Sequence, residues 1–214
     1  MRPIRDIEAV ELNYKVVGEG QNLIVLHGLF GSLDNWMSLA KQWSNHYKVW
    51  LIDQRNHGKS PHSNDFSYLH MAKDLEHFIS SNKIVDPIIL GHSMGGKTAM
   101  EFAVSFPEMV KKLIVVDIAP VKYNVHHYSI LEALNTVKPD QLESRSQAET
   151  ILSKQIPEFG IRQFLLKNLD RNSQGGYQWK FNLEVLEREI VPISEWSVTN
   201  GSYLGATLFI KGEA

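Results

Sequence analysis

One serine of this chain lies in a pattern that is typical of a nucleophile. The segment Gly91-His92-Ser93-Met94-Gly95 fits G-x-S-x-G, and it follows an apolar run that ends at Leu90. A helical stretch comes after it. A glycine-rich turn that merely contains a serine is the other interpretation of the five residues. The order of strand, tight turn and helix favours a nucleophile elbow, with φ > 0 at Ser93 and its hydroxyl at a helix N-terminus.

A second turn could supply hydrogen-bond donors for such a reaction. His27-Gly28-Leu29-Phe30-Gly31 directly follows the apolar run 23–26, about 65 residues before the serine pattern. An oxyanion hole for acyl transfer uses one N–H from a loop at this place and one from the residue after the nucleophile. We therefore expect the N–H groups of Leu29 and Met94 to be the donors, with Phe30 as the alternative to Leu29.

Two further expected strands end in acidic residues. Asp53 follows the run 48–52 and begins a charged and glycine-containing loop that includes His57. We interpret Asp53 and His57 as structural residues that brace this loop. Asp117 follows the run 113–116. Active sites of open α/β sheets lie at the carboxyl edge of the strands. By itself, Asp117 is consistent with a structural cap or with a catalytic acid.

These residues need a scaffold that brings strand ends together, and the first 120 residues predict one. Short apolar runs alternate with stretches that carry apolar residues at helical spacing, beginning near Ser32 and Tyr68. Strands that are buried on both faces of a parallel sheet have this appearance. We predict an α/β fold with a mostly parallel central sheet and flanking helices. The expected strands are residues 9–17, 23–26, 48–52, 88–90 and 113–116.

The remaining residues predict a different arrangement. Residues 121–200 hold helical patterns at 128–137, 147–155, 161–169 and 183–190, without a convincing buried strand. We interpret them as a helical cap over the sheet, inserted between a core of residues 1–120 and an incomplete return to the core at 201–214. The segment 207–210 resumes the buried-strand pattern. We expect at least one of Tyr123, Phe164 and Trp179 to line an apolar pocket near Ser93.

Composition narrows the classes of function. The chain has 214 residues, 43% hydrophobic and 21% charged, which is typical of one globular domain. Its net charge of −2 and its mixed charges indicate no nucleic-acid or membrane partner. The absence of cysteine excludes disulfides, thiolate metal sites and a cysteine nucleophile. No apolar stretch follows the charged first residues, so we expect a cytoplasmic location. We expect no metal or organic cofactor, and the sequence predicts no oligomeric state.

Four motifs taken together resemble a known family. The segments 26–35, 53–58, 91–97 and 117–120 resemble those of the YbfF-type bacterial esterases of the α/β-hydrolase superfamily, and the likeness runs from about residue 23 to residue 212. The resemblance implies esterase or thioesterase activity on acyl esters. It also implies that Asp117 is the acid of a Ser-His-Asp triad. Most α/β-hydrolases carry this acid later, which here corresponds to position 215, and Glu213 is a weaker candidate.

The histidines depart from the family pattern. Triad order in this fold is serine, acid, histidine, but no histidine follows His127. We expect the ring of His92 to point away from the serine, and His126 and His127 fall in the cap. The base is therefore expected to lie outside this chain. We interpret the chain as a truncated hydrolase that lacks the last strand and helix and is a poor catalyst.

The leading hypothesis is a serine carboxylester or thioester hydrolase that acts on small to medium acyl esters. Within the same fold, cofactor-free haloperoxidases and carbon–carbon hydrolases use the same triad, whereas Ser93 argues against enzymes with a carboxylate nucleophile. A non-catalytic ligand-binding protein with a hydrolase fold is the alternative from another class.

Overall fold

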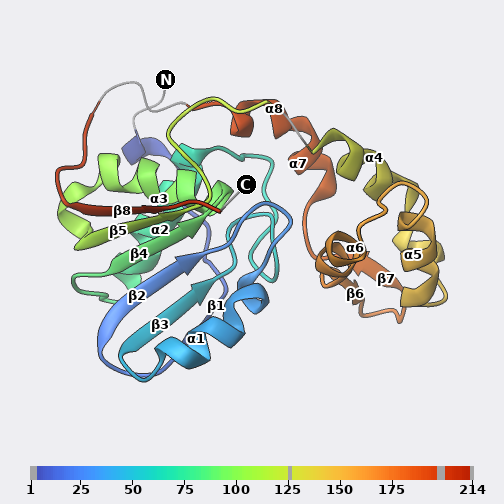
Figure 1. Cartoon of the computed structure of the whole chain (residues 1–214), viewed down its shortest axis with the longest axis horizontal. Helices are drawn as coiled ribbons and strands as arrows, with labels where there is room; N and C mark the ends of the chain where they lie inside the picture. Colours follow the sequence, from blue (N-terminus) through green and yellow to red (C-terminus); the bar gives the residue numbers. More distant parts are fainter. Residues whose placement is uncertain (1–3, 125–126, 197–200, 213–214) are drawn as a thin grey trace.

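The computed structural model describes residues 4–124, 127–196 and 201–212. A six-stranded sheet lies at its centre, in the order β1-β3-β2-β4-β5-β8 (Figure 1). Only the β1–β3 pair is antiparallel, so the predicted α/β fold with a mostly parallel sheet is confirmed. The strands are β1 (Tyr14–Val17), β2 (Gln21–Leu26), β3 (Tyr47–Ile52), β4 (Ile88–His92), β5 (Lys112–Val116) and β8 (Ala206–Ile210).

Helices cover both faces of the sheet, as the apolar runs predict. The side chains of β2 alternate between two hydrophobic clusters, with Ile24 and Leu26 on one face and Leu23 and Val25 on the other. The helices α2 (Tyr68–Ser81) and α3 (Met94–Ser105) pack on the first face, and α1 (Met37–Trp43) packs on the second. Burial on both faces removes apolar area from water, which favours folding at about 25 cal/mol per Å².

The first strand is shorter than the predicted range 9–17. The N–H of Val10 donates to the carboxylate of Asp74, and the N–H of Asn13 donates to the Ser60 hydroxyl, each at 2.8 Å. These amides therefore bind side chains of the core instead of a neighbouring strand. The first predicted helix also begins as a 3₁₀ turn, Leu33–Trp36, before α1.

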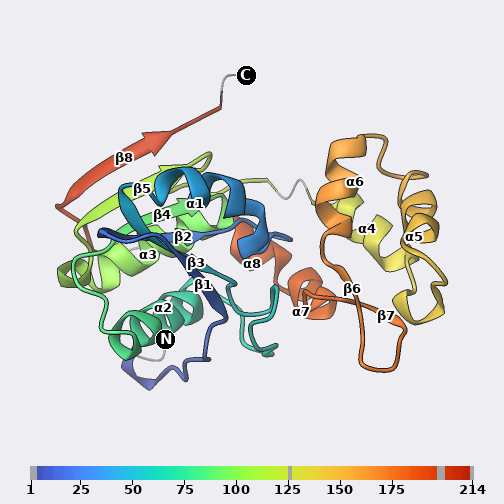
Figure 2. The same ribbon diagram turned by 90° about the horizontal axis from the view of Figure 1, so that it is seen from below.

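A second group of elements lies beside one end of the sheet (Figures 1 and 2). Its members are α4 (Tyr128–Thr136), α5 (Arg145–Leu152), α6 (Phe159–Leu166), β6 (Leu169–Arg171), β7 (Tyr177–Trp179), α7 (Leu183–Arg188) and α8 (Ile190–Ser194). These elements share one hydrophobic cluster, which also includes Phe30, Tyr68 and Met94 of the core. No helix in the described ranges is long and apolar enough to cross a membrane.

The group contains a hairpin that the sequence did not predict. Strands β6 and β7 pair in an antiparallel manner over three residues each. Their turn is closed by Asn172, whose side-chain oxygen accepts from the N–H groups of Gln174 and Gly176. Three residues are too few for an alternating pattern to show in the sequence.

The last strand, β8, lies at the edge of the sheet rather than in its interior. It pairs with β5 alone, and all five of its residues are exposed. The segment 207–210 forms the strand that its apolar pattern predicts, and its side chains are exposed because no further strand pairs with it among the described residues. An apolar run indicates that the side chains of a strand are suited to burial. Whether they are buried depends on the elements that pack against the strand.

Candidate active site

Ser93 lies on a sharp turn between β4 and α3, with φ 52° and ψ −118°. The positive φ that the sequence predicts is confirmed. The turn leaves no room for a side chain at Gly91 or at Gly95, two residues before and two residues after the serine. A methyl group at Gly91 would lie 2.1 Å from the carbonyl oxygen of Gly95, and one at Gly95 would lie 2.5 Å from that of Leu26. The two glycines therefore allow the serine to stand at the N-terminus of α3.

Two other strained residues follow neighbouring strands. Phe30, after β2, has φ 58°, and Asp117, directly after β5, has φ 55°. Left-handed backbone at non-glycine residues costs about 1–3 kcal/mol each and clusters at functional sites. Because β2, β4 and β5 are parallel neighbours, their carboxyl ends bring Phe30, Ser93 and Asp117 to one edge of the sheet.

The backbone N–H groups of Leu29 and Met94 lie beside the serine and have no acceptor among the described residues. The alternative donor, Phe30, is committed elsewhere: its N–H donates to His57 Nε2 at 3.3 Å. The structure therefore leaves Leu29 and Met94 as the pair that can hold a developing negative charge.

Two buried histidines brace this loop. His27 Nδ1 lies 2.8 Å from the carbonyl oxygen of Gly28, and its Nε2 accepts from the N–H of Gln54 at 3.0 Å. His57 Nδ1 lies 3.0 Å from the Arg55 carbonyl oxygen. Burial lowers the pKa of His27 to about 4 and that of His57 to about 3, so both rings are neutral at pH 7. Each therefore carries its proton on Nδ1 and accepts through Nε2.

Asp53 has a structural surrounding, in agreement with its interpretation from the sequence. Its carboxylate accepts from the N–H groups of Leu33 and Lys59 and from the side chain of Asn13, at 2.7–2.9 Å. These bonds hold the loop after β3 against the turn after β2. Asp53 and His57 thus brace the loop.

Asp117 reaches the same edge as Ser93 but is exposed. Its N–H donates to the Ile210 carbonyl oxygen at 2.7 Å, which ties it to β8. Among the described residues its carboxylate binds no histidine. The weaker candidate acid, Glu213, lies outside the described residues.

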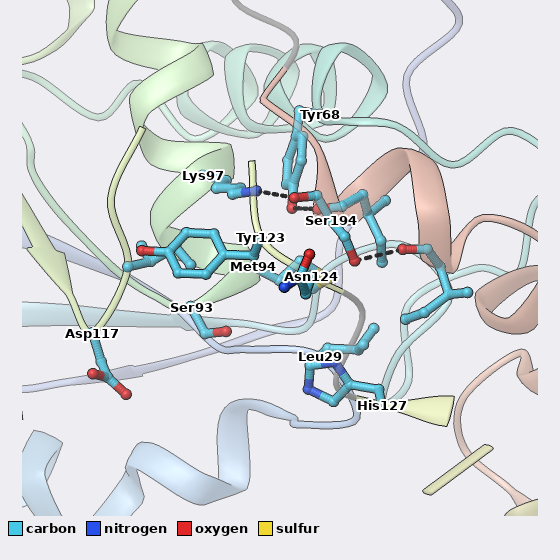
Figure 3. Close-up of a pocket in the computed structure, with 13 residues that line it drawn as sticks. Leu29, Tyr68, Ser93, Met94, Lys97, Asp117, Tyr123, Asn124, His127 and Ser194 are labelled. Carbon is cyan, nitrogen blue, oxygen red and sulfur yellow. Dashed lines mark hydrogen bonds between the residues drawn. The ribbon is translucent and has the colours of Figure 1, made fainter. Parts of the chain in front are cut away.

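Two cavities adjoin Ser93, of about 450 and 410 Å³. Both are lined by Leu29, Ser93 and His127. Figure 3 shows the first, with Asp117 on one side of Ser93 and Leu29 and His127 on the other. The expectation for the cap aromatic residues is confirmed, because Tyr123 lines the first cavity and Phe164 the second. Trp179 lines neither and instead stacks on Phe181 at 5.1 Å.

No histidine ring is hydrogen-bonded to the Ser93 hydroxyl within the described ranges. His92 lines the second cavity, and burial lowers its pKa although the nearby Asp117 opposes the shift. His127, which the sequence places in the cap, lies at both cavities. His126 is outside the described residues. No group of three or more His, Asp or Glu residues in the described part could hold a metal ion.

Lys97 is a cavity residue that the sequence interpretation did not single out, although it ends the motif 91–97. Its Nζ donates to the carbonyl oxygen of Ser194 at 2.9 Å (Figure 3). It also donates to the carbonyl oxygen of Glu195 at 2.8 Å. It also lies over the rings of Tyr68 and Tyr123. Burial lowers the pKa of Lys97 to about 8. Lys97 therefore fastens the C-terminal end of α8 to α3, the helix that directly follows Ser93.

Known proteins share this arrangement. The family model described as "alpha/beta hydrolase fold" matches residues 21–150. The sn-1-specific diacylglycerol lipase ABHD11 of Danio rerio is 39% identical over 99% of this chain and 70% of its own length. Esterase YbfF of Escherichia coli is 37% identical over 81% of this chain and 67% of its own. A putative esterase/lipase of Haemophilus influenzae is 41% identical, and the alignment covers 89% of this chain and 65% of that relative.

A solved structure agrees as well. The solved structure of a marine microorganism esterase is similar to this one, with a TM-score of 0.93 and 45% sequence identity. The match covers 96% of this chain and 82% of the esterase chain. Sequence relatives, family model and solved structure therefore indicate the same group. The chain belongs to the α/β-hydrolase fold family, as an esterase-type hydrolase.

Proposed function

We propose that the protein is a serine hydrolase of acyl esters or thioesters, with Ser93 as the nucleophile. One observation carries this proposal: Ser93 stands at positive φ where two cavities meet, beside two N–H groups that have no acceptor in the described part of the chain. A carbonyl carbon at the serine oxygen would place its own oxygen near the Leu29 and Met94 N–H groups. Donors fixed before the charge develops stabilise the transition state without reorganisation.

The proposed reaction has two halves. The Ser93 oxygen attacks the acyl carbonyl while a histidine accepts its proton, and the N–H groups of Leu29 and Met94 hold the oxyanion. The histidine then protonates the leaving alcohol or thiol, and an acyl-serine remains. Water, deprotonated by the same histidine, attacks the acyl-serine and releases the acid.

The other triad members are part of this proposal. Asp117 is the acid that orients the histidine, supported by its place after β5 at the edge that carries Ser93. We propose that the base is a histidine beyond residue 214, because triad order in this fold places the histidine after the acid and its following strand, and no histidine follows His127. Without its base, a serine hydrolase retains only about 10³- to 10⁴-fold acceleration over water.

The cavities support a small to medium acyl ester as the substrate. Their volumes, about 450 and 410 Å³, fall in the range of sites for small ligands. Tyr123, Phe164 and Ile190 come from the predicted cap, residues 121–200, so we propose that this segment selects the substrate. A cytoplasmic location is part of the same proposal.

The test is hydrolysis of chromogenic esters of increasing acyl length. We compare the 214-residue chain, a version extended through the next histidine, and Ser93→Ala in each. The extended protein should be faster by several powers of ten, and Ser93→Ala should lower its kcat at least about 10⁴-fold. Equal activity of both lengths, lost in each on Ser93→Ala, would place the base within these residues.

The same experiment separates the alternatives. A non-catalytic binding protein would hydrolyse no ester at either length, and a fluorophosphonate would not label Ser93. A haloperoxidase or carbon–carbon hydrolase would be labelled at Ser93 but would turn over esters poorly compared with its own substrates.

A further inference from the structure

Asn168 is a buried polar residue of the cap that reaches the loop carrying Leu29. It lies between α6 and β6, and only 1% of it is exposed. Its Nδ2 donates to the Phe30 carbonyl oxygen at 2.7 Å, across 138 positions of sequence. The same nitrogen has a longer contact of 3.4 Å with the Leu165 carbonyl oxygen.

Asn168 itself is held in place. Its backbone N–H donates to the Leu165 carbonyl oxygen at 3.0 Å, and its own carbonyl oxygen accepts from the N–H of Lys180 at 2.8 Å. Its Oδ1 is buried without a partner among the described residues. A buried polar atom left unpaired costs about 1–3 kcal/mol. A buried amide with an unpaired oxygen is therefore less favourable for packing than an apolar side chain of the same size. The one short hydrogen bond of this amide is the bond to the Phe30 carbonyl oxygen.

Phe30 is held from three directions. Its N–H donates to neutral His57, its carbonyl oxygen accepts from Asn168, and its ring packs edge-on against Phe181 of the cap at 5.5 Å. These contacts stabilise the left-handed backbone of Phe30, which is strained for a residue with a β-carbon. The Leu29 N–H lies one residue earlier in the same short loop, so the contacts that hold Phe30 restrict the movement of the loop segment that carries this N–H.

We propose that Asn168 is a positioning residue that makes the oxyanion hole depend on the docked cap. The inference rests on the proposed function, in which the Leu29 N–H stabilises the oxyanion. With the cap docked, the Asn168 amide holds the Phe30 carbonyl and thereby aims the Leu29 N–H at the reacting carbonyl. With the cap displaced, Phe30 loses both the amide and the Phe181 ring and, of these three contacts, retains the bond to His57.

The chain offers a matched control in Asn182, which also joins the cap to the core. Its N–H donates to the Asn56 carbonyl oxygen at 3.0 Å, and its Nδ2 donates to Asn56 Oδ1 at 3.2 Å. Asn56 belongs to the loop after β3 and not to the Leu29 loop. Asn182→Ala therefore removes one side-chain bond between cap and core, keeps the backbone bond to Asn56, and removes no bond to Phe30.

The experiment compares Asn168→Ala and Asn182→Ala in the esterase extended through its next histidine. Asn168→Ala should lower kcat about 10-fold or more with little change in KM, because a displaced donor affects the transition state more than the bound substrate. Asn182→Ala should leave kcat within about two-fold. Asn168→Leu, which keeps the side-chain volume without a donor, should behave as Asn168→Ala does and replaces it if the alanine variant does not fold.

A second readout needs no catalysis. Amide hydrogen exchange of Phe30, followed by NMR, should be faster in Asn168→Ala and Asn168→Leu than in Asn182→Ala. Equal exchange at Phe30 in all three variants, or equal loss of kcat on both alanine substitutions, overturns the inference. If the unaltered protein neither hydrolyses esters nor reacts with a fluorophosphonate, the proposed function fails, and the exchange rates still decide whether the cap holds Phe30.

Discussion

At the scale of single residues, the site depends on backbone conformations that few sequences tolerate. Phe30, Ser93 and Asp117 all have positive φ at the ends of neighbouring strands. Each is held by hydrogen bonds from elsewhere in the fold, such as the 3.0 Å bond from the Ser93 N–H to the Val116 carbonyl oxygen. Strain of this kind persists only where the surrounding structure determines the conformation. The site is therefore rigid in its backbone before any substrate arrives.

The elbow glycines should be intolerant of even one methyl group. In Gly95→Ala the new carbon would lie 2.5 Å from the Leu26 carbonyl oxygen, which is backbone and cannot rotate away. We expect the free energy of unfolding to fall by about 2 kcal/mol or more, with loss of fluorophosphonate labelling at Ser93. Urea denaturation measures the first effect and gel fluorescence the second.

Gly160 provides the control for this substitution. It lies in α6, and a methyl group there meets nothing within 4 Å. Gly160→Ala should therefore raise the free energy of unfolding by up to about 1 kcal/mol, because alanine favours a helix. If Gly95→Ala is as stable as Gly160→Ala, the turn is looser than its geometry indicates.

At the scale of elements, polar contacts fasten α8, which belongs to the predicted cap, to helices α2 and α3. Lys97 of α3 binds two carbonyl oxygens at the end of α8, and the Tyr68 hydroxyl of α2 donates to the Ile193 carbonyl oxygen at 2.6 Å. Carbonyl groups at a helix C-terminus lack partners within the helix, and a cation there is favourable. Ile190, Ile193 and Ser194, which line the first cavity, are thereby held against the helix that begins at Ser93.

Lys97→Met should weaken this contact and widen the cavity. The change removes the cation and leaves the Glu195 carbonyl oxygen without a donor among the described residues, whereas the Ser194 carbonyl oxygen keeps the Tyr123 N–H at 3.0 Å. We therefore expect the free energy of unfolding to fall by about 1–3 kcal/mol. KM for esters should rise because the cavity wall is less well held. Denaturant titration and steady-state kinetics measure the two effects.

Lys122→Met is the matched control, because Lys122 is also a lysine that binds Glu195. Lys122 binds the Glu195 carboxylate at 2.6 Å, but both side chains are exposed, at 70% and 48%. Exposed ion pairs contribute little, so stability and KM should stay nearly unchanged. Equal effects of the two substitutions would show that Lys97 acts through its charge alone and not through the buried carbonyl contacts.

At the scale of the whole molecule, the sheet ends in two edge strands, β1 and β8, and all residues of β8 are exposed. Leu208, Phe209 and Ile210 on β8 are 52%, 52% and 46% exposed. Figures 1 and 2 show β8 at the rim of the sheet, beside β5. An exposed apolar edge strand pairs readily with another chain.

The 214-residue chain should therefore self-associate through β8. Phe209→Lys adds a charge to the edge, so it should shift the chain toward monomer in sedimentation velocity experiments at increasing concentration. Leu204→Lys is the control, because Leu204 is 94% exposed but lies outside the strand. A chain that is monomeric at all concentrations, or a Leu204→Lys chain that dissociates equally, contradicts this prediction.

The sequence by itself determined the elbow and the succession of strands and helices along the chain. The glycines around Ser93 and the apolar runs on either side are local features. Glycine provides the space that a sharp strand-to-helix turn needs, so the succession of strand, turn and helix can be recognised from neighbouring residues alone. The alternation of strand and helix then predicts a parallel sheet, whose carboxyl edge brings Leu29, Ser93 and Asp117 together. Composition added the absence of cysteine chemistry.

Only the tertiary structure decided which distant groups meet. The bond from Asn168 to Phe30, the contacts of Lys97 with α8, and the use of the Phe30 N–H by His57 join residues that no periodic pattern connects. The hairpin β6–β7 is too short for a pattern, and the exposure of β8 depends on its neighbours and not on its own residues. Periodicity records which face of an element is apolar. Which side chains of other elements pack against that face depends on the path of the whole chain, because all core side chains must pack together.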